Sequence, residues 1–120
     1  MEEWELDFDW LQIRHLIKDK FNQPALPDLK AILFLIGIQE LGRIQETFSK
    51  EEKQDLMHIA VCALLEGDGF YKYKGRDEDG WPHYTVIEAF QVKGSDAQEQ
   101  ILKKKVIEYF QHHKLTTEEE

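Results

Sequence analysis

The spacing of the apolar residues constrains the fold of this chain more than any other feature of its sequence. Through most of the chain, apolar residues recur every three or four positions, which is the period of an amphipathic helix. Between residues 70 and 87 the period changes to two, and this stretch is rich in aromatic residues, as β-strands are. The sequence therefore predicts an α+β fold that is mainly α, with one extended segment in its middle.

The first two helices are separated by a short loop that contains two prolines. A stripe of apolar residues predicts a first helix that is capped by Asp7 and ends near Lys20. Pro24 and Pro27 prevent this helix from continuing, because proline lacks the backbone N–H that an internal helical position needs. The second helix is expected to start at Pro27, where the missing N–H costs nothing.

The third and fourth helices have clear start signals. Ser49 and Glu52 form a capping box, so a third helix is expected over residues 50–66. Gly67 is expected to end it in a left-handed turn. The fourth helix is expected to begin at Ser95. The sequence thus predicts four helices with a two-stranded β-hairpin inserted between helices three and four, in a single domain over residues 1–120 whose acidic C-terminal tail is disordered from about residue 115.

The second helix is apolar nearly all round, since Gln39 is the first polar residue after Lys30. Such a helix is buried on most sides, either at the centre of the domain or partly under another subunit. Gly37 would allow a neighbouring helix to approach closely. A chain of 120 residues has few other elements to cover this helix, so we predict that the protein forms a homodimer.

The extended stretch predicts a β-hairpin. Two β-prone runs flank the segment RDEDG at residues 76–80, which supplies Asp side chains for turn hydrogen bonds and a Gly for positive φ. Pro82 fits the start of the second strand, and the Trp81–Pro82 bond is of the type with a raised cis population. An isolated hairpin is marginal in water, so its aromatic rings must pack on helices or contact another chain. The residues predicted to form an interaction surface are Tyr71, Tyr73, Trp81 and Tyr84.

Composition limits the classes of partner. The chain has 15 Lys and Arg against 24 Asp and Glu, and its net charge of −9 repels the phosphates of nucleic acids. Its single cysteine cannot form an intramolecular disulfide, and the N-terminus lacks the pattern of a signal peptide. No apolar run is long enough to span a membrane. We therefore expect a soluble cytoplasmic protein with no membrane partner and no nucleic-acid partner.

The third helix carries the side chains with the most chemical potential. Asp55, His58, Cys62 and Glu66 are spaced to share one face, and Glu40 of the antiparallel second helix could join them. These are side chains that ligate zinc or iron. No paired Cys or His motif accompanies them, and the simpler interpretation is the solvent-facing side of a helix. We predict no metal and no cofactor, and a metal-dependent enzyme with its site on this helix is one alternative.

Cys62 and His58 could also form a nucleophile and a base one helical turn apart. A cysteine in the body of a helix, however, lacks the N-terminal dipole that lowers a thiol pKa. The sequence contains no nucleophile elbow, phosphate-binding loop or dinucleotide fingerprint. The leading hypothesis is a non-enzymatic protein-interaction or regulatory module whose partner is another protein or a second copy.

The order helix, helix, hairpin, helix resembles a winged helix. Residues 59–87, IAVCALLEGDGFYKYKGRDEDGWPHYTVI, look like the end of a recognition helix followed by a wing. This resemblance implies a DNA-binding regulator whose last helix is a dimerisation arm. A helix-turn-helix also has a short helix before the recognition helix, for which residues 48–67 leave no room. A degenerate winged-helix regulator is the other alternative.

Overall fold

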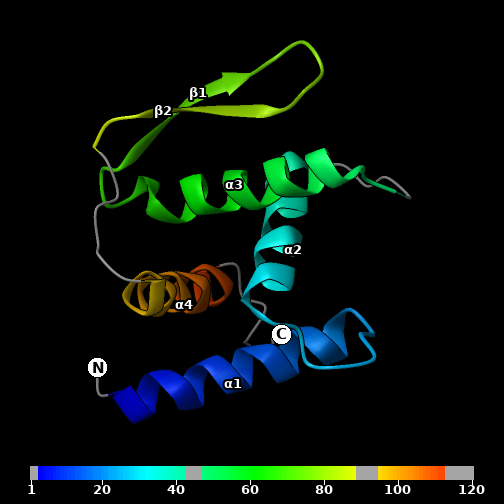
Figure 1. Cartoon of the computed structure of the whole chain (residues 1–120), viewed down its shortest axis with the longest axis vertical. Coiled ribbons are helices and arrows are strands. Elements are labelled where there is room, and N and C mark those ends of the chain that lie inside the picture. Colours follow the sequence, from blue (N-terminus) through cyan, green and yellow to red (C-terminus); the bar gives the residue numbers. More distant parts are fainter. Residues whose placement is uncertain (1–2, 43–46, 89–94, 113–120) are drawn as a thin grey trace. The chain divides into compact units, whose positions relative to one another are not determined.

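The computed structural model describes residues 3–42, 47–88 and 95–112, so the predicted disordered tail lies outside the described residues. In this part of the chain the elements are, in order, α1 (Glu3–Lys20), α2 (Leu29–Leu41), α3 (Lys50–Glu66), β1 (Tyr71–Arg76), β2 (Pro82–Val86) and α4 (Ser95–His112) (Figure 1). The two strands form an antiparallel sheet of their own. This confirms the predicted fold class: a mainly helical chain with a hairpin between its third and fourth helices.

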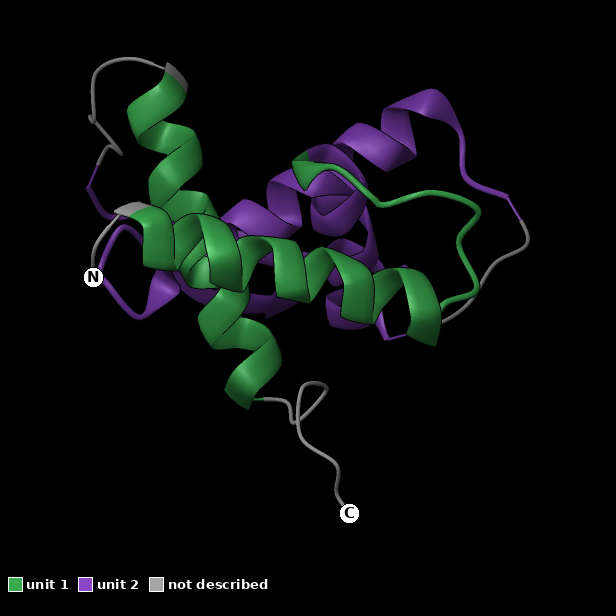
Figure 2. Ribbon diagram, turned by 90° about the horizontal axis from the view of Figure 1, so that it is seen from below, with its two compact units in different colours: residues 1–29, 92–120 green, residues 30–91 purple. Residues whose placement is uncertain are grey.

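The chain divides into two compact units, coloured separately in Figure 2. Unit 1 comprises residues 1–29 and 92–120 and contains α1 and α4, whereas unit 2 comprises residues 30–91 and contains α2, α3 and the hairpin. The single domain over residues 1–120 stays a prediction. Within the described residues, no helix has both the length and the apolar character that crossing a bilayer requires.

Unit 1 is built on contacts between α1 and α4. Helix α1 begins at Glu3, so the expectation that Asp7 caps it is wrong. The residues before Asp7 include Glu5, a good helix former, and a carboxylate there interacts favourably with the positive end of the helix dipole. The apolar stripe predicted for this helix consists of Leu6, Trp10, Ile13, Ile17 and Phe21. The first four are buried, whereas Phe21 follows the last residue of the helix and is 43% exposed.

Helix α1 carries a second apolar stripe that the sequence analysis missed. Trp4, Phe8 and Leu11 are spaced by four and three residues, and they are 68%, 56% and 43% exposed. At 3.6 residues per turn these positions lie about half a turn from the buried stripe. Helix α1 is therefore apolar on two opposite faces, of which one is exposed.

In unit 2, helices α2 and α3 cross steeply at Gly37 (Figure 1). A Cβ atom on Gly37 would overlap the carbonyl oxygen of Leu56 and would lie 2.8 Å from the Leu56 Cβ. Only glycine lets the two backbones approach this closely. The expectation that Gly37 admits a neighbouring helix is confirmed, and the neighbour is α3.

Helix α3 starts as predicted and ends differently. Glu52 N donates to Ser49 Oγ at 3.0 Å, and Ser49 N donates to the Glu52 carboxylate at 2.8 Å, which completes the capping box. Gly67 has φ −63°, so the expectation that it is left-handed is wrong. The chain makes one more tight turn, in which Gly69 N donates to the Glu66 carbonyl at 3.0 Å, and Gly69 is the left-handed residue with φ +87°.

The hairpin has an irregular register. Tyr73 pairs with Tyr84 and Gly75 pairs with His83, so Lys74 is an additional residue on β1. Such a bulge bends the strand and increases its twist. Gly75 has φ +111°, a conformation that favours glycine.

The hairpin packs along α3, and both of its strands contact that helix (Figure 1). Pro82 begins β2 as predicted, and the Trp81–Pro82 bond is trans. The rings of Trp81 and Tyr84 are partly buried against a cluster of buried residues from α2 and α3, namely Leu41, Leu56 and Ile59. This packing explains why the hairpin carries large aromatic side chains at these two positions.

Gly37→Ala tests the close crossing of α2 and α3. The added methyl group must push the two helices apart, and we expect the free energy of unfolding to fall by about 2 kcal/mol. Gly67→Ala is the matched control, because Gly67 has an ordinary helical φ and no atom lies within 4 Å of the added Cβ. That control should be neutral or slightly stabilising, by about 0.5 kcal/mol. Urea unfolding measured by circular dichroism compares the two, and equal midpoints would contradict the crossing.

Candidate functional site: a pocket between helix α3 and the hairpin

A pocket of about 360 Å³ opens between α3 and the hairpin, within unit 2. This volume lies at the lower end of the range for ligand-binding pockets and suits an amino-acid side chain or a small organic molecule. Helix α3 contributes one wall and the hairpin the other. The lining residues are Asp55, His58, Ile59, Cys62, Asp77, Trp81, Pro82, His83 and Tyr84.

Local geometry explains how each wall is formed. Asp55, His58 and Cys62 are spaced by three and four residues, so they project from the same face of α3. On the other wall, the side chains of Pro82 and Tyr84 point to the same side of β2, because side chains alternate along a strand. The pocket is therefore built from one helical face and one end of the hairpin.

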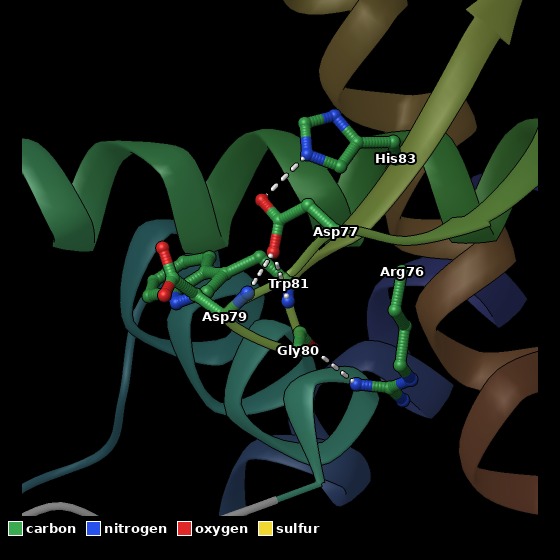
Figure 3. A network of polar contacts seen from close by, with 6 residues as sticks. All are labelled: Arg76, Asp77, Asp79, Gly80, Trp81 and His83. Atoms are coloured by element: carbon green, nitrogen blue, oxygen red, sulfur yellow. Dashed lines mark hydrogen bonds and ion pairs between the residues drawn. The ribbon is translucent and has the colours of Figure 1, made fainter.

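Asp77 fixes the conformation of the hairpin loop (Figure 3). Its Oδ1 accepts hydrogen bonds from the backbone N–H groups of Asp79, at 2.9 Å, and Trp81, at 3.0 Å. His83 Nε2 lies 2.8 Å from Oδ2 and donates to it, since a carboxylate can only accept. The loop that carries Trp81 is thus organised around one carboxylate, as expected for an Asp in this turn.

These contacts hold the pKa of Asp77 below its usual range, with the hydrogen bond from His83 as the largest cause. Because this pKa is lower in the folded chain than in the unfolded chain, the contacts stabilise the loop above the unfolded pKa. The stabilisation is lost as the pH falls through the folded value. At neutral pH Asp77 is therefore ionised and places a negative charge at the edge of the pocket.

Arg76 ties the hairpin to the end of α2 and also bonds to Gly80 in the loop, the contact drawn in Figure 3. Its Nη1 donates to the carbonyl oxygens of Leu41, at 2.8 Å, and Gly80, at 2.7 Å, and its Nη2 donates to the carbonyl oxygen of Glu40 at 2.8 Å. The carbonyls at the end of a helix lack intrahelical partners and carry the negative end of the helix dipole. The guanidinium therefore caps α2 and holds the loop at the same time.

Cys62 is buried, and its Sγ lies 3.5 Å from His58 Nε2. Burial raises the pKa of the Cys62 thiol to about 11, because the thiolate loses its hydration. At neutral pH the thiol is protonated, and only the thiolate is a good nucleophile. The protonated thiol counts against a role of Cys62 and His58 as a nucleophile and base pair.

The pKa of the Tyr84 phenol indicates the sign of the electrostatic potential in this region. Burial raises the pKa of Tyr84, and the nearby carboxylates of Glu40 and Glu66 raise it further. A negative field disfavours the phenolate, so its pKa increases. The electrostatic potential that these carboxylates produce at the inner wall of the pocket, at Tyr84, is therefore negative.

The candidate metal ligands of the sequence analysis separate into two groups. Asp55, His58 and Cys62 line the pocket, whereas Glu40 and Glu66 do not. Glu66 instead accepts a hydrogen bond from the backbone N–H of Tyr73 at 2.9 Å and so links α3 to β1. Across residues 3–42, 47–88 and 95–112, no three His, Cys, Asp or Glu side chains are arranged to hold a metal ion.

The residues predicted to form an interaction surface also fall into two groups in the structure. Trp81 and Tyr84 line the pocket, but Tyr71 and Tyr73 do not. The ring of Tyr71 lies edge-on to that of His58, with centroids 6.2 Å apart, and the partly exposed ring of Tyr73 lies 5.6 Å from that of Tyr84. These two tyrosines support the walls from outside the pocket.

Asp77 and His83 line the pocket but were not predicted as site residues. A local signal is present in the sequence, because Asp77 lies at the start of the expected loop and His83 lies just after it, and a hairpin brings these two sides together. The bulge at Lys74, which sets which residues face each other, has only the adjacent Gly75 as its signal in the sequence.

No family model matches this chain, and no curated protein or solved structure is significantly similar to it. Its function is therefore argued from the geometry of the molecule. A smaller pocket of about 270 Å³ lies between α1 and α4 in unit 1, and its lining has no aromatic ring and no His. The pocket between α3 and the hairpin is the stronger candidate, because rings and ionisable groups meet there.

The single thiol allows a direct test of the site chemistry. With a pKa of about 11 instead of 9.0, Cys62 should carry about 100-fold less thiolate at neutral pH than an ordinary cysteine. We expect the folded protein to react with Ellman's reagent at least about 100-fold more slowly than the same chain in urea. Modification of the folded protein at the rate of a free thiol would indicate a reactive thiolate and would restore the enzyme hypothesis.

Proposed function

We propose that this protein is a non-catalytic protein-interaction or regulatory module that binds its partner in the pocket between α3 and the hairpin. The observation that supports this function is the combination of Trp81 and Tyr84 with ionisable side chains in one concave site. Large aromatic rings in a pocket are typical anchors for a ligand or for a side chain of a partner protein. A location in the cytoplasm belongs to the same proposal, and the single, unpaired Cys62 thiol supports it.

The chemistry of the lining favours binding over catalysis. Catalysis by general acids, bases or nucleophiles uses groups whose pKa lies near the working pH. Burial moves the pKa of Cys62 and that of Tyr84 upward, away from neutrality. Both oxygens of Asp77 accept hydrogen bonds, Oδ1 from the loop and Oδ2 from His83.

One observation counts against the winged-helix alternative. The pocket between α3 and the hairpin presents the carboxylates of Asp55 and Asp77, where a DNA backbone requires cations. A binding module for a protein or a small molecule fits this surface better.

Nuclear magnetic resonance tests the pocket as a binding site. The ¹⁵N-labelled protein is titrated with cationic, neutral and anionic small molecules, and at least one class should shift the Trp81 indole N–H saturably. His58→Phe should block the pocket, because His58 lines it from an exposed position on α3. Gln54→Phe is the control, since it adds the same ring to α3 at an exposed position outside the pocket.

The result that would overturn the proposed function is the absence of saturable shifts with all three classes of probe. Equal binding by the His58→Phe and Gln54→Phe variants would place the ligand elsewhere and would overturn it as well. Thermal melts of both variants establish that each is folded.

We also propose that the chain self-associates, through a surface of α1 and not through α2, which the sequence predicts. The apolar side chains of α2 between residues 31 and 41 are buried or half-buried, so that helix offers no exposed apolar face. The exposed stripe of Trp4, Phe8 and Leu11 on α1 is the better surface for a two-fold contact.

Light scattering at micromolar concentration should give a mass above the 14.3 kDa of one chain. Phe8→Glu should return the mass to that of the monomer. Gln12→Glu should not, because it adds the same charge to the same helix and leaves the apolar stripe intact. A mass of 14.3 kDa at every concentration would exclude the dimer.

A further inference from the structure

We infer that the pocket between α3 and the hairpin takes an organic cation, that is, a guanidinium or alkylammonium group. This inference rests on the proposed function, because it names the class of ligand that the same pocket binds. Its first support is the charge of the lining, which includes the carboxylates of Asp55 and Asp77 and, among the residues that the structure describes, contains no Lys and no Arg. A cation is the ligand whose charge this lining complements.

The carboxylates of Asp55 and Asp77 differ in the number of hydrogen bonds that they already accept within the protein. Asp77 accepts two hydrogen bonds from backbone N–H groups of the hairpin loop and one from the His83 side chain of β2, and its negative charge is partly balanced there. Asp55 is exposed on α3 and has no hydrogen-bond or ion-pair partner among the described residues. Asp55 is therefore the group that can accept hydrogen bonds from an ammonium or a guanidinium.

The aromatic residues supply the second support. The face of an aromatic ring carries a partial negative charge and attracts cations, and Trp is the most effective residue for this. Packing against Leu41, Leu56 and Ile59 holds the rings of Trp81 and Tyr84 in place. A rigid ring loses little entropy when a ligand is bound, so these two rings are suited to contact a cation or its alkyl chain.

The third support is the negative electrostatic potential that two carboxylates outside the lining produce at the wall of the pocket. Glu40 and Glu66 do not line the pocket, yet their charges act on the Tyr84 hydroxyl in the wall. The same field that disfavours a phenolate favours a cation in the pocket. An anion would meet this field with no lysine or arginine among the described lining residues to receive it, and a neutral ligand would leave Asp55 without a partner.

The experiment compares isosteric probes that differ in charge. Isothermal titration calorimetry measures the binding of Nα-acetyl-arginine-N-methylamide, of its neutral citrulline isostere and of the corresponding glutamate derivative. We expect the arginine derivative to bind about tenfold more tightly than the citrulline derivative, as one cation–π contact together with one partly exposed ion pair would give. This preference should weaken as NaCl is raised, because salt screens the charges at the mouth of the pocket.

A cation of this kind could come from a small free amine or from a basic side chain of a partner protein. Agmatine, a free amine that carries the same guanidinium, distinguishes these two sources. Binding of agmatine as tight as that of the arginine derivative indicates a small free amine. Tighter binding of the arginine derivative indicates a basic side chain of a partner protein. Either result supports the cation as the chemistry that the pocket recognises.

Asp55→Asn removes the available charge without changing the shape of the side chain. It should lower the affinity for the arginine derivative about threefold to tenfold and leave the affinity for the citrulline derivative unchanged. Asp7→Asn is the control, because it makes the same change of net charge at an exposed position of α1 outside this pocket. Trp81→Leu keeps an apolar side chain and removes the ring, so it should lower the preference for the cation as well, provided that its thermal melt shows a folded protein.

The possible failures are distinct. If the citrulline or the glutamate derivative binds as tightly as the arginine derivative, the inference about the cation is wrong and the pocket remains a binding site. The inference is also wrong if Asp55→Asn and Asp7→Asn reduce the affinity for the arginine derivative equally. If none of the probes binds at millimolar concentration, the proposed function and the inference are both overturned.

Discussion

The close approach of two backbones at Gly37 is the constraint on which the rest of unit 2 depends. Because Gly37 has no side chain, α2 passes directly over the carbonyl group of Leu56 on α3. The last turn of α2 then lies next to the hairpin loop, where Leu41 joins Leu56 and Ile59 in one buried cluster. This cluster is the surface on which Trp81 and Tyr84 pack, so the pocket walls depend on a residue that lies outside the pocket.

Two ionisable side chains hold the hairpin to this support by bonding to the backbone, and a third orders the loop of the hairpin in the same way. Glu66 accepts from the N–H of Tyr73, Arg76 donates to the carbonyls at the end of α2, and Asp77 accepts from the N–H groups of the loop. A two-stranded hairpin has too little buried surface to be stable by itself, and these bonds compensate for that. Sequence spacing alone made Glu66 a candidate ligand, whereas the structure gives it a supporting role.

The parts of the fold that were predictable from the sequence are those set by short-range interactions. The Ser49 cap and the Pro82 strand start depend on residues within a few positions, and both are where the sequence places them. The sequence did not reveal the contact between Arg76 and Leu41, because no local pattern encodes a bond between residues 35 positions apart. The site was only half predictable for the same reason. The helical wall follows from periodicity, but the hairpin wall depends on the bulge at Lys74.

The positions of the hairpin cations also bear on the charge of the pocket. Arg76 could have neutralised the carboxylates, but its guanidinium is held by the carbonyls of Leu41, Glu40 and Gly80. Lys72 and Lys74 are exposed on β1 and do not line the pocket. The bonds that stabilise the hairpin therefore also keep its arginine away from Asp55. A negatively charged aromatic pocket next to three basic residues is thus a consequence of how the hairpin is attached, and the charge that complements it has to come from the ligand.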